Sequence, residues 1–203
     1  MKKLFIPTKK KFYDVDLTKL SEIKETKIAL AYSIQFEELA ISIEKELEGK
    51  VVQKVQVLGC SSPTFDDSVE AILLIGEGKF HSVSLAYETG KKVYLFNESG
   101  LIEVSSEEVE KLEKREKGAY LRYLHSESVG IMISTKPGQQ RMKRAIEFKE
   151  NVSEKKSYLF LANELKINEF ENFGLDSWVN TACPRMDLDE ASVINITKVE
   201  KSQ

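Results

Sequence analysis

The sequence has 203 residues, of which 41% are hydrophobic and 31% are charged, the balance of a folded globular protein rather than a disordered one. Thirty Lys and Arg residues are interleaved with 33 Asp and Glu residues, and this balance argues against the basic field of a general nucleic-acid binder. No apolar run approaches the roughly 18 residues of a membrane span, and the N-terminal segment lacks the apolar stretch of a signal peptide. The sequence therefore predicts a cytoplasmic protein with no membrane or direct nucleic-acid partner.

After a basic arm or irregular strand over residues 2–11, the first half of the chain alternates between two kinds of apolar pattern. Short apolar or β-branched runs predict buried strands, and apolar residues spaced by three and four predict helices. Ser33 is a plausible cap for the first helix, and Gly49 follows its end. The expected strands cover residues 27–32, 51–58, 70–75 and 92–96, and the expected helices cover residues 36–47 and 80–87. This order is typical of a small parallel α/β unit.

The second half repeats this alternation. Ser105 and Glu108 form a capping-box pattern that opens a long helix. Strands are expected at residues 130–134, 157–161 and 177–180, with helices around residues 142–146 and 164–170. We therefore predict an α/β protein of two small similar modules, residues 1–98 and 99–203, each a mostly parallel sheet of about four strands with flanking helices.

Cysteine and histidine are scarce, since the chain has only Cys60, Cys183, His81 and His125. Each cysteine directly follows a predicted strand, and ligands of open parallel sheets bind at the carboxyl ends of strands. Two thiols placed in this way, one per module, could meet in a cleft. A free cysteine is, however, most often a small buried apolar residue, so both interpretations stay open.

Three other residues follow predicted strands. His81 comes just after the turn Gly76–Gly78, Gln139 lies in the strand-to-helix loop of residues 135–140, and Arg185 follows the second cysteine. A loop at a helix N-terminus suits an anion or a carboxylate, and a guanidinium group binds a carboxylate with two parallel hydrogen bonds. Each residue also has a purely structural alternative. His81 could make a hydrogen bond in the core, Gln139 could cap a helix, and Arg185 could form a salt bridge.

Four stretches, in this order along the chain, resemble motifs of the diphthamide synthase family, which makes 2-(3-amino-3-carboxypropyl)histidine. Two of the four contain a cysteine. They are Val57–Pro63 (VLGCSSP), Ile75–His81 (IGEGKFH), Ser134–Gln139 (STKPGQ) and Trp178–Arg185 (WVNTACPR). The resemblance extends from about residue 27 to residue 195.

The resemblance implies three similar α/β domains, each of which gives one cysteine to a [4Fe–4S] cluster. In the family this cluster cleaves S-adenosylmethionine to a 3-amino-3-carboxypropyl radical, which adds to a histidine of translation elongation factor 2. Cys60 matches the metal ligand of the middle domain and Cys183 that of the last domain. His81, Gln139 and Arg185 are candidates to hold S-adenosylmethionine, although the resemblance does not fix their roles.

The resemblance leaves the first domain and its cysteine unmatched. We therefore expect an enzyme subunit, truncated or split, that completes its iron–sulfur cluster in a homo- or hetero-oligomer with a chain supplying the third cysteine. The alternative is a non-catalytic accessory module that docks on the synthase or on elongation factor 2. An α/β small-molecule binder with structural cysteines is the third possibility.

Overall fold

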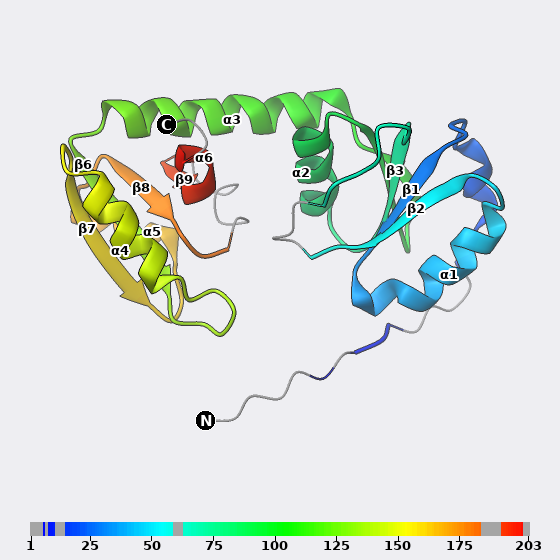
Figure 1. The fold of residues 1–203 in the computed structure, drawn as a ribbon, viewed down its shortest axis with the longest axis horizontal. Coiled ribbons are helices and arrows are strands. Elements are labelled where there is room, and N and C mark those ends of the chain that lie inside the picture. The colour runs from blue at the N-terminus through cyan, green and yellow to red at the C-terminus, as the bar shows by residue number, and fades with distance from the viewer. Residues whose placement is uncertain (1–5, 7, 11–14, 59–62, 184–191, 201–203) are drawn as a thin grey trace. The chain divides into compact units, whose positions relative to one another are not determined.

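The computed structural model describes residues 6, 8–10, 15–58, 63–183 and 192–200. It divides into two compact units, residues 1–110 and 111–203, which are taken in turn below (Figure 1). None of the helices in these described ranges is both long enough and apolar enough to cross a membrane.

The first unit is built on a five-stranded sheet with the strand order β2-β1-β3-β4-β5, in which only β5 runs antiparallel to its neighbour. Its strands are β1 (Ile28–Tyr32), β2 (Val51–Gln56), β3 (Ala71–Ile75), β4 (Lys92–Asn97) and β5 (Gly100–Glu103). Its helices are η1 (Thr18–Glu22), η2 (Ile34–Phe36), α1 (Glu37–Glu46) and α2 (Lys79–Thr89). The predicted parallel α/β architecture is confirmed.

Helices cover both faces of this sheet, with α1 on one side and α2 on the other (Figure 1). Every residue of β1 and of β3 is buried, which explains why both strands are continuous apolar runs. Leu39 and Ile43 of α1 belong to one apolar cluster with Leu30 of β1, whereas Leu85 of α2 belongs to a second cluster with Leu74 of β3. The sheet is therefore held between two apolar layers.

The second unit contains a four-stranded, fully parallel sheet with the order β7-β6-β8-β9. Its strands are β6 (Ser128–Ser134), β7 (Lys156–Ala162), β8 (Ser177–Asn180) and β9 (Val193–Asn195). The helices that follow β5 are α3 (Ser106–His125), α4 (Met142–Asn151), α5 (Ile167–Phe170), η3 (Glu171–Phe173) and α6 (Ile196–Glu200). This sheet also agrees with the predicted fold class.

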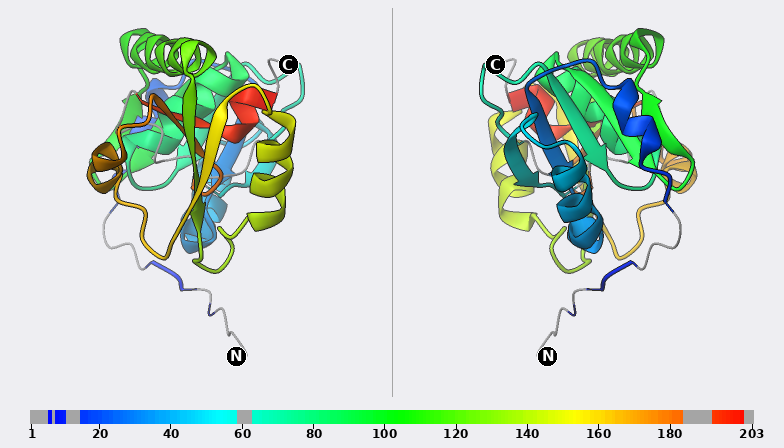
Figure 2. Two further views of the ribbon diagram at one scale, coloured as in Figure 1. Left: turned by 90° about the vertical axis from the view of Figure 1, so that its left-hand side faces the viewer. Right: turned by 90° about the vertical axis from the view of Figure 1, so that its right-hand side faces the viewer.

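The two faces of the second sheet have different cores. Ala119 of α3 and Phe148 of α4 pack on one face, and Phe170 of α5 packs with Trp178 on the other. The end-on view in Figure 2 (left) shows α4 and α5 on opposite sides of the strands. Trp178 lies at the centre of the second core, with its ring centroid 4.8 Å from that of Phe160.

The boundary between the units lies later than the expected position at residues 98 and 99. That position falls in the turn between β4 and β5, and β5 pairs with β4 from Asn97–Gly100 to Tyr94–Glu103. The units instead divide between Glu110 and Lys111, because β5 adds an edge strand to the first sheet. Ser33 also departs from expectation, since it makes no side-chain capping bond and α1 begins after Phe36.

Candidate functional site

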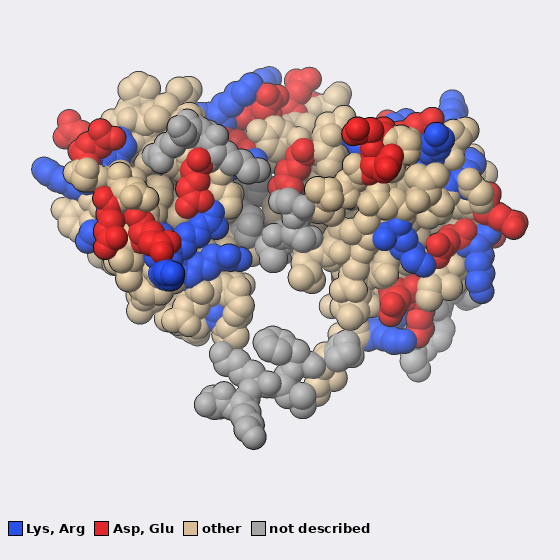
Figure 3. Space-filling view, in the orientation of Figure 1, with Lys and Arg blue, Asp and Glu red and all other residues tan. Residues whose placement is uncertain are grey.

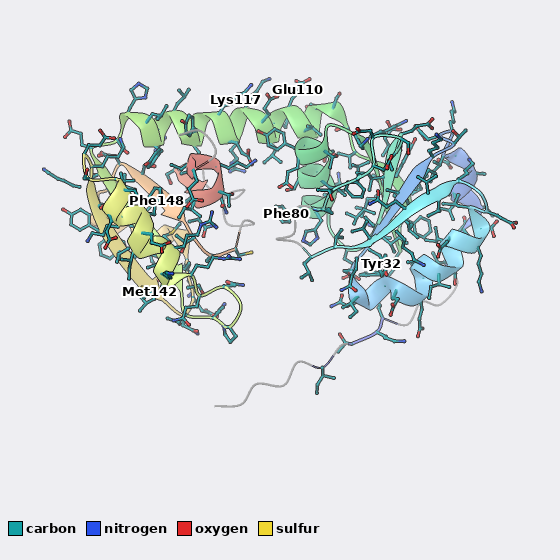
Figure 4. The ribbon with its side chains drawn as sticks, in the orientation of Figure 1. Tyr32, Phe80, Glu110, Lys117, Met142 and Phe148 are labelled. Atoms are coloured by element: carbon teal, nitrogen blue, oxygen red, sulfur yellow. The ribbon has the colours of Figure 1, made fainter. Side chains whose placement is uncertain are left out.

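A pocket of about 360 Å³ lies in the first unit at the carboxyl ends of β1, β2 and β3. Figure 4 labels two residues beside it, Tyr32 at the end of β1 and Phe80 near the start of α2. The lining residues come from the segments that follow these strands and from α2. They are Ser33, Ile34, Gln35, Phe36, Val57, Leu58, Pro63, Leu74, Ile75, Gly76, Glu77, His81, Ser84, Leu85 and Glu88.

The pocket combines apolar walls with a few polar groups. Phe36, Leu74 and Ile75 are buried and form part of the wall, while the exposed residues Glu77 and His81 supply charge and hydrogen-bonding groups. The His81 ring lies 5.1 Å, centroid to centroid, from that of Phe80. Apolar walls with a small number of polar groups are typical of sites for small organic ligands.

The turn that precedes His81 follows β3 directly. The Gly76 amide donates a hydrogen bond of 3.2 Å to the Phe96 carbonyl, and Gly78 has a φ of +88° immediately before α2 begins. Glycine adopts this left-handed conformation without the strain that a side chain would bring. Among the described residues other than the chain neighbours of each glycine, no atom lies within 4 Å of the position that a Cβ on Gly76 or Gly78 would occupy. The backbone is thus open to a ligand at this turn.

Cys60 lies outside the described residues, so its predicted role as a metal ligand is not tested. The described residues on either side of its segment, Leu58 and Pro63, both line the pocket. Val57 continues from β2 and donates its amide to the Tyr32 carbonyl at 2.8 Å. The described chain on both sides of residues 59–62 therefore lines the pocket.

Cys183 lies in the second unit, three residues after the end of β8, and is a free, half-buried cysteine. The Asn180 side chain closes this segment, because Nδ2 donates to the Cys183 carbonyl at 2.7 Å while Oδ1 accepts the Ala182 amide at 2.8 Å. The Thr181 hydroxyl donates to the Met132 carbonyl at 2.7 Å. These hydrogen bonds position the backbone of Cys183 at the carboxyl end of the sheet.

Gln139 is half-buried in the loop that follows β6, the strand beside β8. Its backbone amide donates to the Lys136 carbonyl at 3.1 Å, and the backbone amide of Lys136 donates to the Ser134 hydroxyl at 3.1 Å. The loop leads from β6 into α4, which begins at Met142 as the sequence predicts, and the Gln139 backbone amide is used in a turn before that helix. The Gln139 side chain nevertheless belongs to the same sheet edge as Cys183.

The predicted site residues thus divide between the units. His81 lines the pocket of the first unit, and Gln139 and Cys183 follow neighbouring strands of the second. Arg185 lies outside the described residues. Within the described ranges, no group of three or more His, Cys, Asp and Glu side chains could hold a metal ion.

Sequence reasoning missed Lys10 and Asn180. Lys10 pairs with Glu77 at the pocket, and Asn180 fixes the Cys183 backbone. A polar residue at the end of a buried apolar strand was a local signal for Asn180, but no local pattern marks Lys10. Basic and acidic side chains are mixed over the face shown in Figure 3, so a single lysine does not stand out by charge.

Comparison with known proteins identifies relatives of one kind. Residues 1–194 match the model of a family described as diphthamide synthesis proteins. A relative from Methanocaldococcus jannaschii, named 2-(3-amino-3-carboxypropyl)histidine synthase, is 28% identical over 81% of this chain and 46% of its own length. The Pyrococcus horikoshii protein of the same name is 28% identical over 66% of this chain and 40% of its own length. Subunit 1 of the synthase from Mus musculus is 25% identical over 88% of this chain and 44% of its own length. The chain therefore spans less than half the length of each of these relatives.

Solved structures share the fold. A crystal structure of Dph2 from Pyrococcus horikoshii aligns with a TM-score of 0.79 and 24% identity, over 94% of this chain and 63% of that one. A crystal structure of the same protein with a 4Fe-4S cluster aligns with a TM-score of 0.77 and 24% identity, over 90% and 59% of the two chains. Since the family match extends over residues 1–194, the chain belongs to the family of diphthamide synthesis proteins.

Proposed function

We propose that this chain acts in the first step of diphthamide biosynthesis, the transfer of a 3-amino-3-carboxypropyl group from S-adenosylmethionine to a histidine of translation elongation factor 2. Family membership and the names of the curated relatives support this reaction. The observation on this chain that carries the proposal is Cys183, a free and partly accessible thiol held by Asn180 at the carboxyl end of a parallel strand.

The donor set of this chain fits an iron–sulfur cluster. Cysteine thiolates hold such clusters, and the cluster-containing Dph2 structure is a relative by fold. Cys183 meets the requirement for a ligand, because its thiol is free, partly exposed and attached to a positioned backbone. Cys60 would be the second ligand from this chain, with any further ligand lying outside this sequence. When bound, the cluster would supply the electron for cleavage of a carbon–sulfur bond, chemistry that protein side chains do not provide.

The side chains would then bind and orient the substrate. The apolar walls of the first-unit pocket would pack against an apolar part of the substrate, and His81 would offer a ring nitrogen as a hydrogen-bonding group there. The side-chain amide of Gln139 would donate to the carboxylate of the substrate or accept from its amine. The Arg185 guanidinium would bind the carboxylate with two hydrogen bonds. These assignments explain why polar residues follow strands whose other residues are buried.

Anaerobic reconstitution tests the metal site. The chain is incubated with iron and sulfide, alone and with candidate partner chains, and absorption at about 400 nm is recorded, where iron–sulfur clusters generally absorb. We expect a band in the wild type that is reduced in Cys60→Ser and in Cys183→Ser, while Thr135→Ser, which keeps both thiols, retains it. Absence of the band under every condition would refute the proposal.

A non-catalytic accessory module remains the second candidate function. It is supported by the cysteine count, because this sequence offers only Cys60 and Cys183 where the family resemblance implies three cysteine ligands. Capture by elongation factor 2, combined with an assay for methylthioadenosine release, separates the two functions. Release in proportion to this chain supports the enzyme, whereas binding without release supports the accessory role.

A further inference from the structure

Lys10 contacts Gln35, Phe36, Glu77 and Glu98 at the carboxyl edge of the first sheet. Its ammonium group forms ion pairs with the carboxylates of Glu77 and Glu98, the latter at 2.8 Å. Its backbone amide donates to the Gln35 carbonyl at 3.0 Å. The ammonium nitrogen also lies 5.9 Å from the centroid of the Phe36 ring, within the range of a cation–π interaction.

These four partners belong to the segments that follow three adjacent parallel strands. Gln35 and Phe36 follow β1, Glu77 follows β3, and Glu98 follows β4. Gln35, Phe36 and Glu77 all line the pocket. A single side chain therefore connects the segments on either side of the pocket mouth.

The environment of Lys10 favours a defined position for its ammonium group. The side chain is 29% exposed, and the hydrogen bonds that its ammonium group donates, to Glu77 first and then to Glu98, raise the pKa of Lys10 above its ordinary value. One isolated surface ion pair contributes little, because water and side-chain entropy oppose it, but several charges in one network hold a geometry more strongly. Lys10 belongs to such a network.

Lys9 provides an internal comparison. It also forms one ion pair with a glutamate, 2.8 Å from Glu38 of α1, but its side chain is 60% exposed. Glu38 does not line the pocket. The neighbouring lysine thus has similar chemistry without a contact to the pocket.

We propose that Lys10 is a positioning residue for this pocket, because it ties the segments after β1, β3 and β4 together and fixes the Glu77 carboxylate at the rim. A site whose walls are held in place before binding loses less conformational entropy when its ligand arrives. The choice of ligand rests on the proposed function, which makes S-adenosylmethionine the probe.

The sign of the effect distinguishes positioning from simple electrostatics. S-adenosylmethionine carries a positive sulfonium, whereas S-adenosylhomocysteine has a neutral thioether in its place. If Lys10 acted only through its charge, Lys10→Ala would remove a repulsive cation and strengthen binding of the sulfonium compound. If Lys10 positions the pocket, Lys10→Ala weakens the binding of both compounds. Lys10→Arg, which can pair with the same carboxylates, then restores the binding of both.

Two measurements on the full chain decide the question. Calorimetric titration with each compound should give a roughly three- to tenfold loss of affinity for Lys10→Ala, near-wild-type affinity for Lys10→Arg and no change for Lys9→Ala. Hydrogen exchange should be faster in Lys10→Ala at the amides of Phe36 and Gly76, which the structure shows bonded to the carbonyls of Ser33 and Phe96.

The titration tests the proposed substrate as well as the role of Lys10, whereas hydrogen exchange tests the role of Lys10 alone. If the wild type binds neither compound, the proposed substrate is wrong, and the exchange rates still decide whether Lys10 holds the segments. Unchanged exchange at both amides in Lys10→Ala, or stronger binding of the sulfonium compound alone, would overturn the positioning role.

Discussion

At the scale of single residues, Gly130 and Trp178 approach each other closely. This contact gives a structural reason for Trp178, which in the sequence is only the first residue of a family motif. Gly130 of β6 is paired with Trp178 of β8. A Cβ on Gly130 would lie 2.1 Å from one carbon of the indole ring. The ring is 4% exposed and packs against Phe160 and Phe170, so it has nowhere to move. Trp178 is a core residue that only glycine at position 130 accommodates.

Gly130→Ala should therefore lower the free energy of unfolding of the second unit by about 1–3 kcal/mol, the usual cost of overpacking. Urea unfolding followed by the fluorescence of Trp178, the single tryptophan, measures this directly. Gly118→Ala on α3 is the matched control. Outside the backbone of α3 itself, no described residue has an atom within 4 Å of the new Cβ, so this substitution should raise stability by up to about 1 kcal/mol. Equal effects of the two substitutions would contradict the packing argument.

Asp176 gives the second unit a defined response to acid. Its Oδ2 accepts hydrogen bonds from the hydroxyl and amide of Ser128 and from the amide of Glu127, at 2.7, 2.8 and 3.1 Å. These bonds, the Ser128 hydroxyl first, hold the pKa of Asp176 below its ordinary value of 3.8. A depressed pKa stabilises the folded state above the unfolded value, and this contribution is lost as the pH falls through the folded value.

Asp176→Asn should accordingly lose less stability than the wild type when the pH is lowered below about 4. Ser128→Ala, which removes one of the three donors, should show an intermediate response. Chemical unfolding at a series of acid pH values, followed by Trp178 fluorescence, provides the comparison. Parallel curves for wild type and Asp176→Asn would show that the hydrogen bonds do not shift the carboxyl group.

At the scale of elements, the segment after β8 shows how a strand end presents a thiol. Asn180 is buried, and its amide spans the segment by bonding both the Ala182 amide and the Cys183 carbonyl. Thr181 ties the same segment to β6 through the Met132 carbonyl. The hydrogen bonds of Asn180 position the backbone of Cys183, whereas the hydrogen bond of Thr181 joins the segment after β8 to β6.

Asn180→Ala should therefore change the alkylation rate of Cys183 several-fold, because the thiol is no longer held in one position. Thr181→Val should leave that rate near the wild-type value while lowering stability by about 1 kcal/mol. The rates are measured with iodoacetamide in a Cys60→Ser background, so that Cys183 alone reacts. Equal rates in all three proteins would show that Asn180 does not position the thiol.

The regular elements could be predicted from the sequence where local patterns are strong. The capping box at the start of α3 is present, with the Glu108 amide 3.3 Å from the Ser105 hydroxyl. By contrast, β5 and β9 are four and three residues long, too short to give a pattern, and they exist because they pair with β4 and β8. The strand β7 was expected, but not its exposed edge position.

The site was predictable to the same extent. Cys183 follows a strand whose pattern is local, so its place at a sheet edge could be expected. Lys10 could not be expected, because Glu77 is 67 positions away and nothing near either residue marks the contact. Long-range ion pairs depend on the folded sheet, which brings separate strand ends together.

At the scale of the whole molecule, each unit has its own buried cores. Among the described residues, two apolar clusters belong to the first unit and two to the second. The helix α3 contributes Val109 to a cluster of the first unit, and Ala119 and Tyr123 to a cluster of the second. A unit with a complete core satisfies the main requirement for folding alone.

A fragment of residues 105–203 should therefore fold and unfold cooperatively, with Trp178 emission close to that of the full chain. Keeping Ser105 preserves the cap of α3. Circular dichroism and fluorescence over a urea series test this expectation. A broad transition without a baseline would show that the second unit depends on the first.

The complete burial of β1 between β2 and β3 also bears on synthesis. Residues 28–32 leave the ribosome before either neighbouring strand, and β3 follows about 40 residues later. At a translation rate of about 5–20 residues per second, roughly 2–8 seconds pass before β3 is synthesised, and during this time β1 lacks at least one of its two partner strands. The charged residues Lys24, Glu25 and Lys27 stand directly before it, and charges in such positions reduce pairing with other nascent chains. Replacing Lys24 and Lys27 with neutral residues should lower the yield of soluble protein during translation, while Glu25 is kept because its carboxylate pairs with Lys92 and accepts a hydrogen bond from Tyr94 of β4.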